Sequence, residues 1–117
     1  MNKITSHKDL KVWQESMNLV TEIYSISERF PNHEAYGLIT QLRRAAVSIP
    51  SNISEGAGRK GKKEFSRFLF IALGSLSEVE TQLEIAFRLD YIKDIEETNK
   101  KIFFIRKMLA NLIKSLK

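Results

Sequence analysis

Residues 62–89 read KKEFSRFLFIALGSLSEVETQLEIAFRL, and their apolar side chains recur three or four positions apart. In an α-helix this spacing gathers the apolar side chains on one face, whereas a strand would alternate them. The stripe comprises Phe65, Phe68, Leu69, Ala72, Leu76, Val79, Leu83 and Ala86. We predict a long amphipathic helix that gives one continuous face to a hydrophobic core.

Three other segments repeat this periodicity, at about Asp9 to Arg29, Glu34 to Ala57 and Ile95 to Leu116. Pro50 falls inside the second of them, and a proline within a helix removes one backbone hydrogen bond and crowds the preceding turn. We therefore expect a kink near Val47 to Pro50, or two shorter helices there. Four helices joined by short loops predict an all-α fold, an antiparallel up-down-up-down four-helix bundle with its second helix kinked near Pro50.

A chain of 117 residues, 43% hydrophobic and 28% charged, has the size and composition of one globular domain, which we expect to span residues 1–117. It contains no cysteine, which excludes disulfides, thiolate-bound metals, iron–sulfur clusters and a cysteine nucleophile. The first residues lack the apolar region of a signal peptide, and the longest apolar run, Phe68 to Leu73, is too short to span a bilayer. We expect a cytoplasmic protein without a membrane partner.

The positive charge of the chain is concentrated between residues 41 and 67, where seven basic residues and two acidic ones give a local net charge of +5. This equals the formal charge of the whole chain. The basic residues are Arg43, Arg44, Arg59, Lys60, Lys62, Lys63 and Arg67, and the acidic ones are Glu55 and Glu64. Such a concentration predicts a surface for a polyanion, and the backbone of RNA or DNA is the natural candidate. The alternative is a helix-ending glycine followed by a solvated charged turn.

The loop Gly56 to Lys63 contains G-x-G-x-x-G and nearly completes G-x-x-x-x-G-K-[ST], two nucleotide-binding patterns. Both patterns require a buried strand before the glycines, and residues 48–55, SIPSNISE, cannot form one. Lys63 also stands where a nucleotide-binding loop needs a hydroxyl group for magnesium. We therefore predict no nucleotide cofactor, but a basic loop before a helix still offers N–H donors and positive charge to a phosphate.

Arg43 and Arg44 admit a second interpretation, because they lie among apolar residues in the predicted second helix. Asn52 and Glu55 follow a few turns later, and Glu55 could pair with one of the arginines across Pro50. A partly buried carboxylate needs such a partner. The sequence thus leaves open whether these arginines bind a ligand or form a structural polar network with Asn52 and Glu55.

Catalysis and metal binding find little support in the sequence. His7 and His33 have acidic residues nearby, but both lie at expected helix starts, and neither an H-E-x-x-H motif nor a nucleophile elbow is present. A di-iron bundle needs Glu-x-x-His pairs, and no histidine follows residue 33. We predict a non-enzymatic protein with no catalytic residues, cofactor or metal.

Aromatic side chains suggest two further expectations. Trp13 and the phenylalanines could stack on unpaired bases, but at helical spacing we expect them in the core. A basic protein of this kind would then bind the nucleic-acid backbone rather than read the base sequence.

Phe70, Ile71 and Phe87 lie off the main apolar stripe of the third helix. Surplus apolar surface predicts contact with another subunit, unless the bundle simply buries wide arcs.

Several stretches together resemble a known family. They are Asp9–Trp13, Tyr36–Leu38, Gln41–Ile53, Glu55–Gly56 with Arg59, Glu64–Phe65, Phe68–Leu69 and Gly74–Glu78. Over about residues 9–92 the chain resembles the four-helix-bundle family named for proteins encoded in intervening sequences of bacterial 23S ribosomal RNA genes. The resemblance implies a homopentamer, and kinship with the accessory variability protein of diversity-generating retroelements, which binds nucleic acid and a reverse transcriptase. It supplies no catalytic residues.

The leading functional hypothesis is a non-enzymatic, oligomeric four-helix bundle that binds RNA or DNA backbone through the basic segment. The alternative is a protein–protein interaction scaffold whose basic loop serves only solubility, with no nucleic-acid binding. Salt dependence of binding would distinguish the two.

Overall fold

The computed structural model describes residues 6–117, which form four α-helices and two short 3₁₀ helices and no strand. The α-helices are α1 (Lys11–Ser27), α2 (Leu38–Ala57), α3 (Lys62–Arg88) and α4 (Glu96–Ser115). The 3₁₀ helices are η1 (His7–Asp9), before α1, and η2 (Asn32–Glu34), before α2. The predicted all-α four-helix fold is confirmed, although α1 and α2 begin later than expected. Residues 1–5, which the single-domain and signal-peptide expectations also cover, lie outside the described part.

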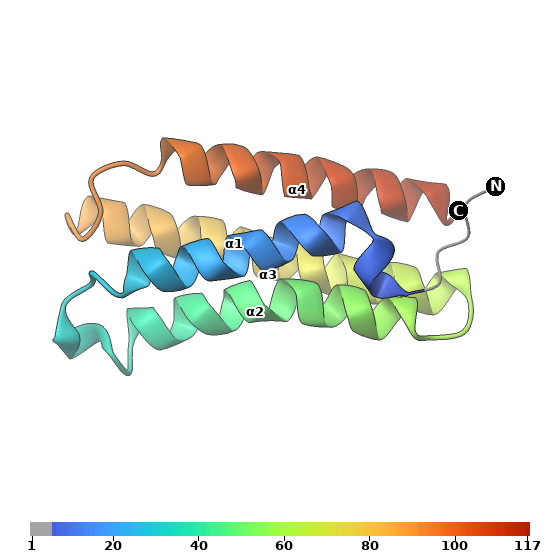
Figure 1. Ribbon diagram of the computed structural model, residues 1–117, viewed down its shortest axis with the longest axis horizontal. Helices are drawn as coiled ribbons and strands as arrows, with labels where there is room; N and C mark the ends of the chain where they lie inside the picture. The colour runs from blue at the N-terminus through green and yellow to red at the C-terminus, as the bar shows by residue number, and fades with distance from the viewer. Residues whose placement is uncertain (1–5) are drawn as a thin grey trace.

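The helices lie side by side along the long axis of a particle of 47 × 25 × 20 Å. Each helix contacts two others, α1 with α2 and α4, and α3 with α2 and α4. Figure 1 shows the chain reversing its direction at every connection between helices. The α2–α3 loop and η1 consequently lie at one end of the bundle, and the α1–α2 and α3–α4 connections lie at the other.

The core consists of the residues that the helical spacing selects. Leu69, Ala72, Leu76, Val79 and Leu83 of α3 are completely buried. The other helices add the completely buried Leu19, Ile23, Leu42, Ile49, Ile53, Ile102 and Leu109. Burying such side chains stabilises the fold by roughly 1.5–3 kcal/mol each before entropic costs.

Helix α2 continues through Pro50 without interruption, so the expectation of two shorter helices is wrong. The ring of Pro50 is buried, and the apolar contacts of that ring offset the hydrogen bond that its missing N–H would have made. A kink of the helix axis at this position stays a prediction.

Two glycines shape the turn from α2 to α3. A Cβ atom on Gly56 would lie 2.8 Å from Cβ of Phe68 and 3.0 Å from Cδ1 of Phe65, so only glycine lets the two helices approach so closely here. Gly61 has φ of 92°, a left-handed conformation that other residues rarely adopt. The glycines that resemble a nucleotide-binding loop therefore have structural roles in reversing the chain.

Candidate nucleic-acid interface

The α2–α3 loop gathers five of the seven predicted cations at one end of the bundle. Arg59 and Lys60 follow α2, Lys62 and Lys63 open α3, and Arg67 comes about one turn later. All five side chains are exposed. We call this surface, residues 59–67, the basic end.

The ring of Phe68 contacts both arginines of the basic end. The Cζ atom of Arg59 lies 5.2 Å from the ring centroid, and that of Arg67 lies 4.5 Å from it. A cation near an aromatic face is attracted by the ring's electrons. Because Phe68 is itself buried, it holds the two guanidinium groups at defined positions on the surface.

Each of these arginines also pairs with a glutamate three or four residues earlier in the chain. Arg59 donates from Nη2 to Oε2 of Glu55 at 2.8 Å, and Arg67 donates from Nε to Oε2 of Glu64 at 3.1 Å. The hydrogen bond from Arg67, assisted by the charge of Arg59, holds the pKa of Glu64 below its ordinary value. The pairs are exposed, so their net contribution to stability is small.

The three lysines of the basic end have no such partner. Within residues 6–117, the side chains of Lys60, Lys62 and Lys63 form no hydrogen bond or ion pair. No side chain caps the start of α3, whose first N–H groups lie in this same region. Three ammonium groups and the positive end of a helix dipole therefore face solvent together.

Arg43 and Arg44 lie elsewhere, about 20 Å back along α2 from the basic end at 1.5 Å per residue. Arg43 bridges to α1, because its Nε donates to Oγ of Ser27 at 2.8 Å and its Nη2 donates to the carbonyl oxygen of Tyr24 at 3.2 Å. Its guanidinium group also lies 4.4 Å from the centre of the Tyr24 ring. Arg44 is exposed. The predicted cationic segment thus forms two separate sites.

The expected pairing of Glu55 with Arg43 or Arg44 is wrong, since the partner of Glu55 is Arg59. Arg59 follows Glu55 by four residues, just beyond the end of α2, so the pair forms locally without bridging Pro50. Asn52 belongs to a different network, donating from Nδ2 to the carbonyl oxygen and Oγ of Ser48 at 2.8 and 2.9 Å.

Ser75 of α3 extends that network, because its Oγ lies 2.9 Å from Oγ of Ser48. The sequence analysis missed both serines. The contact of Ser48 with Asn52 could have been found from their i, i+4 spacing. No neighbouring residue in the sequence indicates that Ser75, on another helix, would join them.

The residues predicted for a subunit interface are exposed but do not form one patch. Phe70 is 58% exposed, and Ile71 and Phe87 are also exposed. Phe70 and Phe87 are about 25 Å apart along α3 and rotated by about 100°, from the rise and twist of an α-helix. The sequence analysis missed Phe103 and Phe104 of α4, which are 54% and 61% exposed and pack edge to face with ring centroids 5.9 Å apart.

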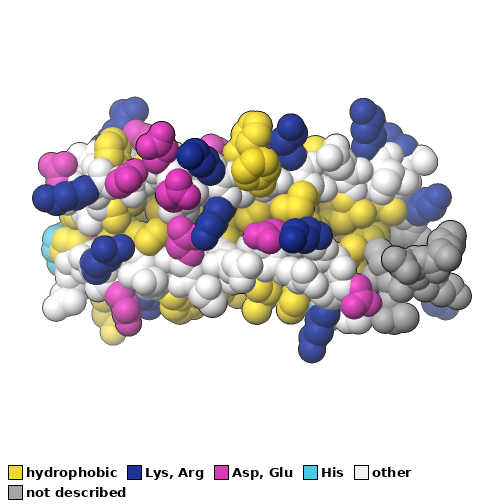
Figure 2. All heavy atoms as spheres, turned by 45° about the horizontal axis from the view of Figure 1, so that its top comes forward, with side chains coloured by type: hydrophobic (Ala, Val, Ile, Leu, Met, Phe, Trp, Pro, Cys, Tyr) yellow, Lys and Arg dark blue, Asp and Glu magenta, His cyan; other side chains and the backbone are white. Residues whose placement is uncertain are grey.

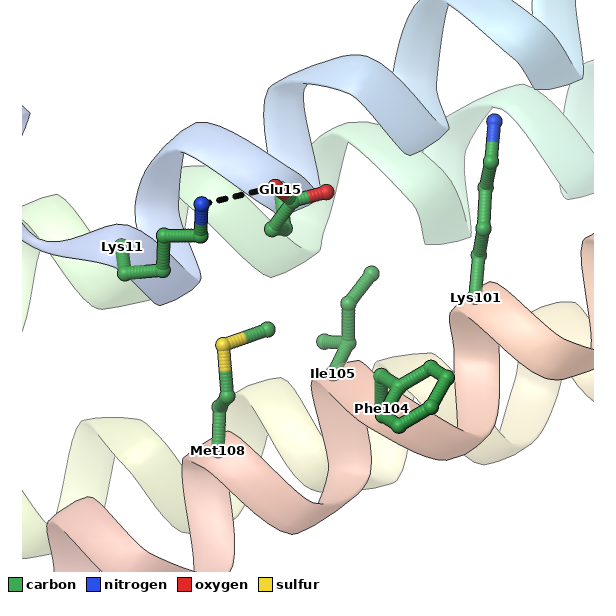
Figure 3. Close-up of a pocket in the computed structure, with 6 residues that line it drawn as sticks. All are labelled: Lys11, Glu15, Lys101, Phe104, Ile105 and Met108. Atoms are coloured by element: carbon green, nitrogen blue, oxygen red, sulfur yellow. Dashed lines mark ion pairs between the residues drawn. The ribbon is translucent and has the colours of Figure 1, made fainter.

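A hollow of about 330 Å³ lies beside Phe104, between α1 and α4. Figure 3 shows Phe104, Ile105 and Met108 of α4 on one side, and the ion pair of Lys11 with Glu15 on α1 across from them. Figure 2 shows hydrophobic side chains along this face of the molecule, flanked by intermixed acidic and basic ones. Because acidic and basic side chains are intermixed here, the net charge of this face is less positive than that of the basic end.

The histidines lie apart from one another. The His7 ring packs edge-on against Trp13, with centroids 5.1 Å apart. His33 lies at the end of the bundle opposite the basic end, where the Tyr91 hydroxyl donates to Oε2 of Glu34 at 2.8 Å and lies 3.3 Å from Nε2 of His33. Within residues 6–117, no cluster of three His, Asp or Glu side chains is arranged to hold a metal ion.

Two glutamates of α3 also pair with arginines, Glu80 with Arg106 and Glu84 with Arg88.

Three findings complete the description. No helix within residues 6–117 is long and apolar enough to cross a bilayer. A comparison with curated proteins finds no significant match. Residues 8–111 match the sequence profile of the family described as 23S rRNA-intervening sequence protein, in agreement with the residues that carry the resemblance and with the four-helix architecture. This chain is therefore a member of the 23S rRNA-intervening sequence protein family.

Proposed function

We propose that this protein is a non-enzymatic, oligomeric, cytoplasmic bundle that binds the phosphate backbone of nucleic acid through its basic end. The observation that carries the proposal is the grouping of Lys60, Lys62 and Lys63, which are exposed and form no hydrogen bond or ion pair within residues 6–117, around two arginines held by Phe68. Phosphate groups attract such cations without regard to base sequence.

The ion pairs of the two arginines leave them available to a ligand. Both the Arg59–Glu55 pair and the Arg67–Glu64 pair are exposed to solvent, where an ion pair contributes about 0–1 kcal/mol. A phosphate can accept two parallel hydrogen bonds from a guanidinium group and can replace a carboxylate at small cost. The glutamates would then orient the arginines until nucleic acid arrives.

Fluorescence anisotropy with generic RNA and DNA, measured over a range of salt concentrations, tests the proposal. Each lysine that contacts a phosphate adds about 0.7–0.9 to the slope of log affinity against log salt. Replacing Lys60, Lys62 and Lys63 by glutamate should therefore abolish binding at physiological salt. A matched triple replacement on α4, at Lys100, Lys107 and Lys114, should retain most of it.

Circular dichroism should show that both triple variants remain helical. If the basic-end variant binds as well as the native protein does, the basic end is not the site. If no nucleic acid binds even at low salt, the proposed function fails altogether.

The oligomeric state is part of the proposal, and a homopentamer is the expected assembly. The adjoining exposed rings of Phe103 and Phe104, which lie beside the hollow between α1 and α4, support it, because a contiguous apolar patch on a surface is commonly covered by another subunit. Light scattering at several protein concentrations measures the mass directly. A monomer at every concentration would remove this part of the proposal.

A protein-interaction scaffold is the second candidate, and the hollow beside Phe104 favours it. A partner's apolar side chain could enter between Phe104 and Met108. Capture of such a partner would survive nuclease treatment and high salt, and Phe104→Ala would abolish it. Loss of capture after nuclease treatment would favour nucleic acid instead.

A further inference from the structure

Two surface hollows follow one another between α1 and α2. The first, of about 360 Å³, is lined by Tyr24, Thr40, Arg43, Arg44 and Val47. The second, of about 330 Å³, reaches from Val47 to Trp13 and His7. Val47 lines both, so the two hollows adjoin, and together we call them the α1–α2 groove.

Among residues 6–117, Arg43 and Arg44 line the α1–α2 groove and no carboxylate does, so its charge is positive. Three other surface hollows have both signs of charge, and Arg44 also lines the one that contains Glu78. The groove also leads toward the basic end, because Ser54 lines it and the carbonyl oxygen of Ser54 accepts from N–H of Gly58 in the α2–α3 loop. An anionic occupant thus finds cations at both ends.

Aromatic rings line the same groove. Tyr24 is 42% exposed, and its ring is held by the guanidinium group of Arg43, which is fixed in turn by Ser27. Trp13 is partly exposed at the other end, where the edge contact with His7 orients its ring. Unpaired bases stack on such rings, whereas a double helix keeps its bases stacked on one another. Planar surfaces between cations therefore suit a single strand better than a duplex.

We propose that the α1–α2 groove binds single-stranded nucleic acid, with bases stacked on Tyr24 and Trp13 and phosphates held by Arg44 and the basic end. This inference rests on the proposed function and adds the form of nucleic acid and the path it follows. Arg44 and Ala57, the last residue of α2, are about 20 Å apart at 1.5 Å per residue, so the strand must be several nucleotides long to reach the basic end.

Trp13 is the only tryptophan of the chain, so its intrinsic fluorescence reports on the groove directly. The full-length protein is titrated at low salt with oligouridine, oligothymidine and a duplex of the same length, about 12 nucleotides, within the site sizes of single-strand binders. Both single strands should quench Trp13 and bind several times more tightly than the duplex. A preference for oligouridine over oligothymidine, or the reverse, tells whether the ligand of the groove is RNA or DNA.

Tyr24→Leu should weaken single-strand binding about fivefold or more and leave duplex binding unchanged. Tyr24→Phe keeps the ring and should bind as the native protein does, which separates stacking from any effect on folding. Tyr36→Leu makes the same exchange at an almost fully exposed tyrosine that lines neither hollow of the groove, so it serves as the matched control and should change nothing.

The proposal that the groove binds a single strand would be wrong if single strands and duplex bound equally, Trp13 were not quenched and Tyr24→Leu had no effect. Phosphate binding at the basic end would remain possible in that case. A change of molecular mass in Tyr24→Leu, seen by sedimentation, would also overturn the proposal for the groove, because a second copy of the chain would then occupy the groove. Absence of binding to every probe at low salt would instead reject the proposed function.

Discussion

The guanidinium carbon of Arg59, in the α2–α3 loop, lies 5.2 Å from the centre of the Phe68 ring, in the second turn of α3. The contact exists because Gly56 lets α2 and α3 approach closely at this point. Phe68 is buried, so it ties the charge of the loop to the core of the bundle. Packing at this end should therefore affect binding as well as stability.

Replacement of Phe68 by leucine should weaken binding while the protein stays folded. Leucine keeps most of the buried volume, and such exchanges usually cost below about 1.5 kcal/mol. It removes the ring that holds Arg59 and Arg67, however, and each cation–ring contact is worth about 0.5–1 kcal/mol at an exposed site. Anisotropy at low salt should show a dissociation constant raised about two- to fivefold, with unfolding in urea little changed.

Phe70→Leu provides the control for this variant, because Phe70 is exposed on the same helix and contacts no arginine in the described structure. Its affinity should equal that of the native protein. Native affinity in Phe68→Leu would show that the ring does not position the two guanidinium groups.

Gly56→Ala should destabilise the protein by about 1–3 kcal/mol, the usual cost of overpacking a well-packed site. The added Cβ would meet Cβ of Phe68 at 2.8 Å, and neither atom can move without shifting its helix. Gly74→Ala is the matched control, because a Cβ atom there has no neighbour within 4 Å. In the interior of α3 that change should stabilise by about 0.5–1 kcal/mol. Urea unfolding measures both, and equal effects would contradict the close approach of α2 and α3.

The helices were predictable because the signal for each of them is contained in the helix itself. The stripe from Leu69 to Leu83 repeats at the helical period, and those side chains are the ones that are buried. The basic end was predictable for a similar reason, since residues 59–67 are neighbours in the chain and any loop brings them together. The continuity of α2 was not, because the cost of Pro50 depends on where its ring packs.

The partners of Arg43 and Glu55 show where the sequence stops being informative. Arg43 binds Ser27 and Tyr24, residues of another helix whose facing side no local pattern reveals. The Glu55–Arg59 pair had a local signal in its i, i+4 spacing, but the expected break at Pro50 drew attention to a pairing across it. Trp13 was expected in the core, and it does pack against the core, but it is only partly buried and also lines a surface hollow.

Stability should depend on pH through Glu34 and Tyr91. The hydrogen bond from the Tyr91 hydroxyl, followed by that from N–H of Leu38, lowers the pKa of Glu34 below its ordinary 4.5. Because the pKa of Glu34 is lower in the folded state, its carboxylate adds to the free energy of unfolding above pH 4.5. That contribution is lost as the pH falls through the pKa of the folded state. The same hydrogen bond raises the pKa of Tyr91 above 10.0. The contribution of Tyr91 to the free energy of unfolding is therefore present below pH 10.0 and is lost as the pH rises through the raised pKa.

Tyr91→Phe removes the shared hydrogen bond and should flatten both arms of this profile. Urea unfolding at a series of pH values, from acid to alkaline, measures it. Tyr36→Phe is the control, because Tyr36 is almost fully exposed, and its profile should match that of the native protein. Unchanged acid and alkaline arms in Tyr91→Phe would show that the pair does not control the pH dependence.

Glu22 should anchor α4 to α1. Its Oε1 accepts from the hydroxyl of Thr98 at 3.0 Å and its Oε2 accepts from Nζ of Lys101 at 2.6 Å, and Thr98 is buried. Glu22→Ala leaves the Thr98 hydroxyl buried without its acceptor, which costs about 1–3 kcal/mol. Glu97→Ala removes an exposed pair with Lys100 and a weaker attraction to Lys101, and should cost about 0.5 kcal/mol or less. Hydrogen exchange should show α4 opening more readily in Glu22→Ala alone, and equal protection of α4 in the two variants would mean that apolar packing by itself fixes this helix.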